Sequence, residues 1–76
     1  MNDARRKELT KAIALIEDAK SILEIEQQGE QEYFDNMPEN MQSGDRGQRA
    51  EEVADLLSEV VTSCEEAISS VESALE

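Results

Sequence analysis

The residue types that carry most protein chemistry are scarce in this chain. Its 76 residues include one cysteine, Cys64, and no histidine. A thiol becomes a nucleophile beside a base or a positive charge, and a structural zinc site needs several Cys or His ligands. Cys64 has no such neighbours in the sequence, and it lies in an apolar stripe of helical spacing. We therefore expect Cys64 to be a structural residue, with no catalytic residue, no metal and no cofactor in the chain.

Carboxylates are abundant, but their spacing does not favour acid–base chemistry. Glu52, Asp55 and Glu59 are three or four residues apart on the polar face of a predicted helix, where solvated side chains are the usual outcome. The loop acids Asp35 and Glu39 lack the spacing of an EF-hand. No glycine-rich phosphate-binding loop is present either. The sequence thus predicts a protein that is not an enzyme.

The charge is distributed unevenly along the chain. In total there are 19 acidic and 7 basic residues, giving a net charge of −12. Residues 1–20 are nearly neutral, and Arg46 and Arg49 are the only cations beyond Lys20. Such an acidic chain does not favour direct binding to nucleic acid or to anionic lipid. No apolar run approaches the ~20 residues of a membrane span, so we expect a soluble, cytoplasmic protein.

The C-terminal half has the clearest structural pattern. Apolar residues recur from Ala50 to Leu75 in a heptad stripe that occupies the a, d and e positions. A period of seven over more than three heptads predicts a helix that packs in a left-handed supercoil. Asp45 and Gln48 have the spacing of a capping box. We therefore predict a helix over about 46–75, with Asp45 as its N-cap.

The N-terminal half is also helical by pattern. Leu9, Ile13, Ile16 and Ala19 lie on one face of a helix predicted over about 3–33. A loop over about 34–45 follows, because Pro, Asn, Ser and Gly cluster there. Two helices of equal length joined by a short loop predict one domain over 1–76, an all-α antiparallel helical hairpin. This topology brings the basic N-terminal turns beside the acidic end of the second helix.

The apolar faces of both helices are wider than a two-helix hairpin requires. Each covers roughly half of the helix circumference, against the ~100° stripe of an ordinary surface helix. The excess predicts that two hairpins form a homodimer, as an antiparallel coiled coil or four-helix bundle. A different protein on the same face and a monomer are the alternatives. The residues expected at this oligomer interface are Leu15, Ile22, Leu56, Val60, Cys64 and Ala67.

The loop and its approach form the first candidate binding site. Both aromatic residues of the chain, and both methionines other than Met1, fall within nine positions. Either they plug the open end of the hairpin core, or they form a recognition surface with adaptable anchors. The candidate partner-binding residues are Tyr33, Phe34, Asp35, Asn36, Met37, Pro38, Glu39, Asn40 and Met41.

The acidic outer faces form the second candidate. Carboxylates such as Glu51, Asp55 and Glu59 recur along the outside of the second helix. Such a row either keeps the protein soluble or imitates a nucleic-acid backbone for a basic, nucleic-acid-binding protein partner. The second interpretation predicts binding that weakens steeply with salt.

The stretch EYFDNMPENMQSGDRGQRAEEVADLLSEVV resembles a pattern in short proteins of phages and prophages, mostly of unknown function. In that pattern a Phe-Asp-Asn-hydrophobic-Pro-Glu-Asn-hydrophobic-Gln segment precedes a Glu/Ala-rich heptad helix. Here the segment is Phe34 through Gln42, followed by Ala50-Glu51-Glu52 and Asp55-Leu56. The resemblance covers roughly residues 31–70 and brings no catalytic residues with it. It implies a phage accessory protein made in a bacterial cytoplasm.

Together these observations predict a small acidic phage-type protein that acts by binding another protein. The favoured hypothesis is an inhibitor of a host or defence protein. A structural or assembly component of the virion is the alternative within the same resemblance. A third hypothesis is a sponge for a small signalling ligand at the oligomer interface. Its weak point is charge, because nucleotide-type ligands need cations and only Arg46 and Arg49 lie near the loop.

Overall fold

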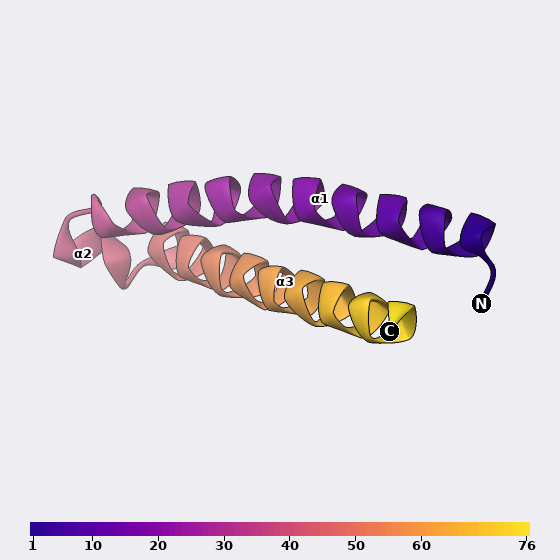
Figure 1. Cartoon of the computed structure of the whole chain (residues 1–76). Coiled ribbons are helices and arrows are strands. Elements are labelled where there is room, and N and C mark those ends of the chain that lie inside the picture. The colour runs from indigo at the N-terminus through magenta and orange to yellow at the C-terminus, as the bar shows by residue number, and fades with distance from the viewer.

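The computed structural model describes all residues from 1 to 76 and is entirely helical (Figure 1). Helix α1 runs over Asp3–Asp35, the short α2 over Glu39–Gln42 and α3 over Asp45–Leu75. The predicted all-α class is confirmed. Helices α1 and α3 lie side by side with opposite chain directions, α2 connects them at one end, and both termini lie at the other (Figure 1).

The two long helices meet along a seam of heptad positions. The least exposed residues of each helix recur at alternating steps of three and four, as expected when two helices wind around each other. On α1 these seam residues are Arg6, Leu9, Ile13, Ile16, Lys20, Leu23, Gln27, Glu30 and Phe34. On α3 they are Gly47, Ala50, Ala54, Leu57, Val61, Cys64, Ile68, Val71 and Leu75. Ala19, predicted on this face of α1, is exposed instead.

Contacts near the two ends of the seam show which residues of α1 lie opposite which residues of α3. The Arg6 guanidinium donates to the Leu75 backbone carbonyl at the open end, where the termini lie. Glu30 and Ala50 line one cleft near the loop. With these two pairs aligned, the heptad register places Lys20 at the height of Val61, and Phe34 at the height of Gly47. The seam therefore runs the full length of both helices.

The connection between the helices differs from the predicted plain loop. Helix α1 continues two residues beyond the expected end, to Asp35, and four of the loop residues form α2. The Asn2 side chain caps α1 by accepting from the Arg5 backbone N–H at 2.8 Å. The predicted capping box is wrong, because Gly44 is the N-cap of α3 and makes no side-chain cap.

Gln48 accordingly has a different role from the one predicted. Its side-chain amide donates to the Ser43 carbonyl at 3.1 Å, and its backbone N–H donates to the Gly44 carbonyl at 2.9 Å. Asp45 is the first residue of α3, where a negative charge still favours the helix dipole. The helix thus begins one residue earlier than a cap at Asp45 would allow.

The chain on its own buries very little. Only four residues are buried, and all lie at the loop end: Met37, Gly47, Ala50 and Ala54. The Cα atoms extend over 58 × 15 × 13 Å with a radius of gyration of 17.2 Å, against about 11 Å expected for a compact domain of this length. The molecule is a thin rod of two helices without a third layer to cover them.

Gly47 is required by the packing at the loop end. A Cβ atom on Gly47 would lie 2.2 Å from the Gln42 carbonyl oxygen and 2.5 Å from two other Gln42 backbone atoms. Backbone atoms of a short connection cannot move aside as a flexible side chain can. The absence of a side chain therefore lets the end of α2 rest directly on α3.

Candidate functional site

The two flanks of the seam have different chemistry. One flank is acidic: carboxylates of α1 and α3 face each other across a shallow cleft. The residues lining it are Glu17, Lys20, Ser21, Glu24, Glu65, Ile68 and Glu72. Lys20 reaches from the seam toward Glu65, with 3.7 Å between Nζ and Oε1. This ion pair joins the two helices and neutralises one of the four carboxylates on the acidic flank.

The opposite flank is apolar. In an antiparallel pair the two rows next to the seam on one side belong to equivalent heptad positions. On this side they carry Ala12, Ala19 and Glu26 of α1, and Val53, Val60 and Ala67 of α3; the next rows outward add Leu15, Ile22 and Leu56. Glu26 is the one charged residue among them, and we call the eight apolar residues the apolar flank.

Large side chains of the apolar flank are uncovered. Leu15 and Ile22 are each 63 % exposed, Leu56 is 48 % exposed and Val60 is 43 % exposed. Fully burying one such side chain contributes about 1.5–3 kcal/mol, so the exposed fractions represent stabilisation that the single chain does not obtain. Four large apolar residues in one strip resemble an unoccupied interface rather than scattered surface residues.

Five of the six residues predicted at the oligomer interface lie on this flank. They are Leu15, Ile22, Leu56, Val60 and Ala67. The sixth, Cys64, lies in the seam between α1 and α3 and is half-buried there. Its heptad position faces the other helix of the same chain, so the expectation that it lies on the outer interface does not agree with the structure.

The nine predicted loop residues divide into an inner and an outer group. Met37 is 9 % exposed and Phe34 is half-buried, and the Gln42 side chain holds the turn by donating to the Phe34 carbonyl at 3.1 Å. Met41 is 41 % exposed and Tyr33 is 50 % exposed. The remaining members are exposed: Asp35, Asn36, Pro38, Glu39 and Asn40. We call the exposed segment 38–41 the loop cap.

A second cleft joins the apolar flank to the loop end. It has a volume of about 270 Å³ and is lined by Glu30, Tyr33, Arg46, Arg49, Ala50 and Val53. We call it the loop-end cleft. Both cations found beyond Lys20 thus lie beside the only tyrosine. Sequence reasoning noted these arginines but missed this grouping, because it depends on which side of α1 faces α3.

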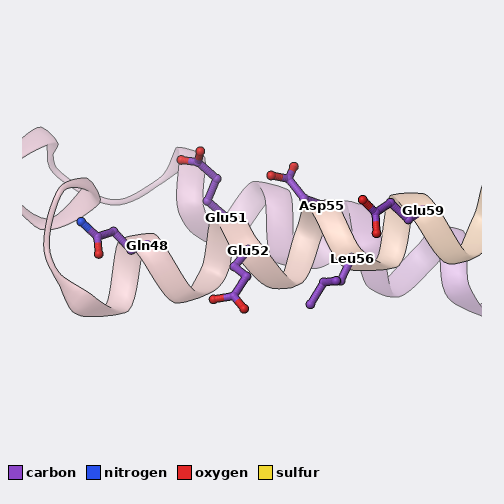
Figure 2. Close-up of a pocket in the computed structure, with 6 residues that line it drawn as sticks. All are labelled: Gln48, Glu51, Glu52, Asp55, Leu56 and Glu59. Atoms are coloured by element: carbon purple, nitrogen blue, oxygen red, sulfur yellow. The ribbon is translucent and has the colours of Figure 1, made fainter.

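The outer face of α3 carries the predicted acidic row. Figure 2 shows Glu51 and Asp55 projecting to one side of the helix, while Glu52 and Leu56 project to the other. All of these residues come from one helix, and no second element closes over them. This surface is an open row of carboxylates in which Leu56 is the one apolar member.

The basic first turns of α1 lie at the acidic end of α3, but their cations make no ion pair with its carboxylates. Arg6 contacts the Leu75 carbonyl rather than a carboxylate, and Lys11 pairs with Glu8 on its own helix at 3.5 Å. Arg5 and Lys7 make no ion pair. Lys7 lies on a row that points away from α3, and Arg5 lies on the same row as Ala12 and Ala19. Proximity of the helix ends therefore does not by itself pair these charges with the acids of α3.

Comparison of the chain with protein families, with curated proteins and with solved structures gave no match. No helix is long and apolar enough to cross a membrane. No group of three or more Cys, His, Asp or Glu side chains is arranged to hold a metal ion.

Proposed function

We propose that this protein is a helical hairpin that works as a homodimer and binds another protein as a small accessory factor. One observation carries the proposal: four exposed large apolar side chains, two from each long helix, lie together on the apolar flank. An exposed apolar strip of this kind is typical of a surface that another protein chain covers. The surface offers no nucleophile or base in an enclosed pocket, so binding is the activity that it supports best.

The size of the core supports dimerisation. A chain of 76 residues with four buried residues lacks the buried area that stabilises an independent domain. Packing the apolar flanks of two copies against each other creates a second layer. The product is a four-helix bundle, in which Leu15, Ile22, Leu56 and Val60 become core residues.

The loop cap is the proposed contact with the partner protein. Phe34 and Met37 point inward and stabilise the turn, which leaves Met41 and its exposed neighbours free for recognition. Methionine adapts its shape to a partner surface. The resemblance of this segment to phage and prophage proteins suggests a host or defence protein as the target, which the small protein would inhibit by occupying its surface.

The proposal is tested by comparing three variants in one capture experiment. Tagged wild-type protein, Met41→Ser and the control Ile25→Ser are incubated with a lysate of a bacterium that carries a related prophage. Ile25 is 67 % exposed on the outer face of α1, away from the loop cap. A protein captured by the wild type and by Ile25→Ser, but lost with Met41→Ser, supports recognition by the loop cap.

Two results would count against the proposal. A protein captured equally by all three variants does not use the loop cap. A captured protein released by moderate salt points instead to the acidic surfaces, because solvent-exposed ion pairs are screened. Sedimentation equilibrium of the purified wild type tests the dimer separately, and a folded monomer at micromolar concentration would contradict it.

A further inference from the structure

The loop-end cleft contains charges that the chain leaves unpaired. Neither Arg46 nor Glu30 makes an ion pair within the molecule, and Arg49 pairs only with the exposed Glu52 of its own helix, at 3.2 Å. Tyr33 is half exposed beside them. A cleft with two guanidinium groups, a carboxylate and a free aromatic face can bind a surface that presents the same groups in the complementary order.

The alignment of α1 with α3 shows which residues of the two helices lie at the same height along the flank. In the seam, Lys20 lies at the height of Val61, so Ile22 of α1 lies at nearly the same height as Val60 of α3. By the same register Tyr33 and Glu30 of α1 lie near the height of Arg49 of α3, in agreement with the cleft that all three line. The α1 side of the flank therefore carries apolar groups and a carboxylate at the heights where the α3 side carries apolar groups and a cation.

We propose that a second copy covers the apolar flank with both loop ends at the same end of the bundle. In this arrangement α1 of each copy lies over α3 of the other. Ile22 then meets Val60 of the second copy, and Arg49 meets Glu30 and Tyr33 of the second copy. The loop-end cleft of one chain is completed by the other. This inference depends on the dimer proposed above and adds its orientation and its contacts.

The opposite orientation pairs the surfaces poorly. With the loop ends at opposite ends, each α3 lies over the α3 of the other copy and each α1 over the α1, so Glu30 comes over Arg5 and Glu8, one cation and one carboxylate. The arginines of the loop-end cleft then come over the region of Ser70 and Ala74, which offers no carboxylate on this flank. Charge complementarity therefore favours the arrangement with the loop ends together.

This orientation has a consequence for function. The two loop caps come to lie next to each other at one end of the bundle, so one dimer presents two Met41 side chains on a single composite surface. A partner with two equivalent sites, or with one broad site, binds such a surface with the combined contacts of both copies. The open ends, with their four termini, lie at the far end and take no part.

Distance measurements test the orientation directly. In a Cys64→Ser background, a spin label is placed either at Ser43→Cys beside the loop cap or at Ser73→Cys near the open end; both positions are exposed. With loop ends together, both labels give distances well under half of the 58 Å length of the chain. With loop ends opposed, both labels give distances close to that length, which overturns the orientation while the dimer stands. A sample without dipolar coupling and with monomeric sedimentation overturns the dimer as well.

A mixing experiment tests the contact between the copies. Arg49→Glu places a carboxylate opposite Glu30 of the second copy, and Glu30→Arg places a third cation in the cleft, opposite Arg49 of the second copy. Each variant alone is expected to dimerise at least tenfold more weakly than the wild type, because like charges face each other across the interface. A mixture of the two variants restores opposite charges only if the contact is between chains, so it recovers wild-type affinity as a heterodimer.

Two controls complete the design. Ile22→Asp, on the apolar flank, is expected to abolish the dimer at micromolar concentration, whereas Ile25→Asp on the outer face leaves it intact. Circular dichroism at high protein concentration verifies that the variants remain helical. If the charge-reversed variants fail to recover on mixing while Ile22→Asp still dissociates the dimer, the cleft contact is wrong.

Discussion

The loop end and the open end of the molecule use the same seam with different results. At the loop end the α3 residues are Gly47, Ala50 and Ala54, and all three are buried. At the open end the seam residues Ile68, Val71 and Leu75 are larger and more apolar, yet none is buried. Apolarity does not explain this difference, because the more apolar end is the less buried one.

Side-chain size explains it. Small residues on α3 have little surface to cover, and Gly47 lets the Gln42 backbone at the end of α2 lie directly against α3. Met37 closes this end from above, with 9 % of its surface exposed. At the open end the side chains are larger and no connecting segment covers them, so solvent reaches them. Burial along the seam therefore depends on small side chains and on the cover that the connection supplies.

The largest loss of stability is expected from adding a side chain at Gly47, where the backbones of the loop end are closest. Gly47→Ala places a Cβ atom 2.2 Å from the Gln42 carbonyl oxygen, so either α2 or α3 must shift. We expect a loss of about 3 kcal/mol in the free energy of unfolding, measured by urea denaturation at fixed protein concentration.

Gly29→Ala is the matched control for that substitution. Nothing lies within 4 Å of a Cβ atom at Gly29, and alanine favours a helix interior by about 1 kcal/mol over glycine. We expect this variant to be at least as stable as the wild type. Equal losses in both variants would show that the tight contact at Gly47 has no special importance.

Replacing Met37, the buried methionine of the loop end, is expected to cause the next largest loss of stability. Met37→Ser replaces the most buried large side chain with a small polar one, and should cost about 2 kcal/mol. Met41→Ser changes an exposed methionine of the same loop and should alter stability by less than about 0.5 kcal/mol. Thermal unfolding followed by circular dichroism measures both, and a similar loss in the two variants would contradict the division into inner and outer loop residues.

Shortening a seam side chain at the open end should reduce the stability by less. Val71 is a half-buried seam residue, and Val71→Ala is expected to cost about 0.5–1 kcal/mol, below the cost for a fully buried site. Amide hydrogen exchange provides the local readout: exchange should accelerate in the last turns of α3 and remain slow around Ala50 and Ala54. Uniform acceleration along both helices would mean that the two ends unfold together.

The smallest expected effect is at the contact that closes the open end. Arg6→Gln removes the guanidinium that donates to the Leu75 carbonyl. Because this contact is partly exposed, we expect a loss of no more than about 0.5 kcal/mol, visible mainly as faster exchange near Leu75. A loss comparable to that of Gly47→Ala would reverse the comparison between the ends.

Sequence periodicity located most of the secondary structure and much of the candidate interface. The heptad spacing from Ala50 to Leu75 predicted α3, and five of the six expected interface residues lie on the apolar flank. It missed Lys20, Gln27 and Glu30 as seam residues, because their polarity hides a position that only spacing reveals. It also placed the N-cap at Asp45, since a side-chain cap is readable in a sequence whereas a backbone-only cap at Gly44 is not.

The sequence by itself determined that the chain is helical, that its apolar residues form two wide stripes and that its acidic residues lie elsewhere. Those features follow from local spacing, which each helix expresses without its neighbour. Only the tertiary structure decided which part of each stripe became the seam and which part stayed uncovered. A stripe can meet a partner helix along any of its rows, and in this fold the row with the small residues Gly47 and Ala54 lies in the seam. That choice leaves Leu15, Ile22, Leu56 and Val60 on one flank and joins Tyr33 to Arg46 and Arg49 at the loop end.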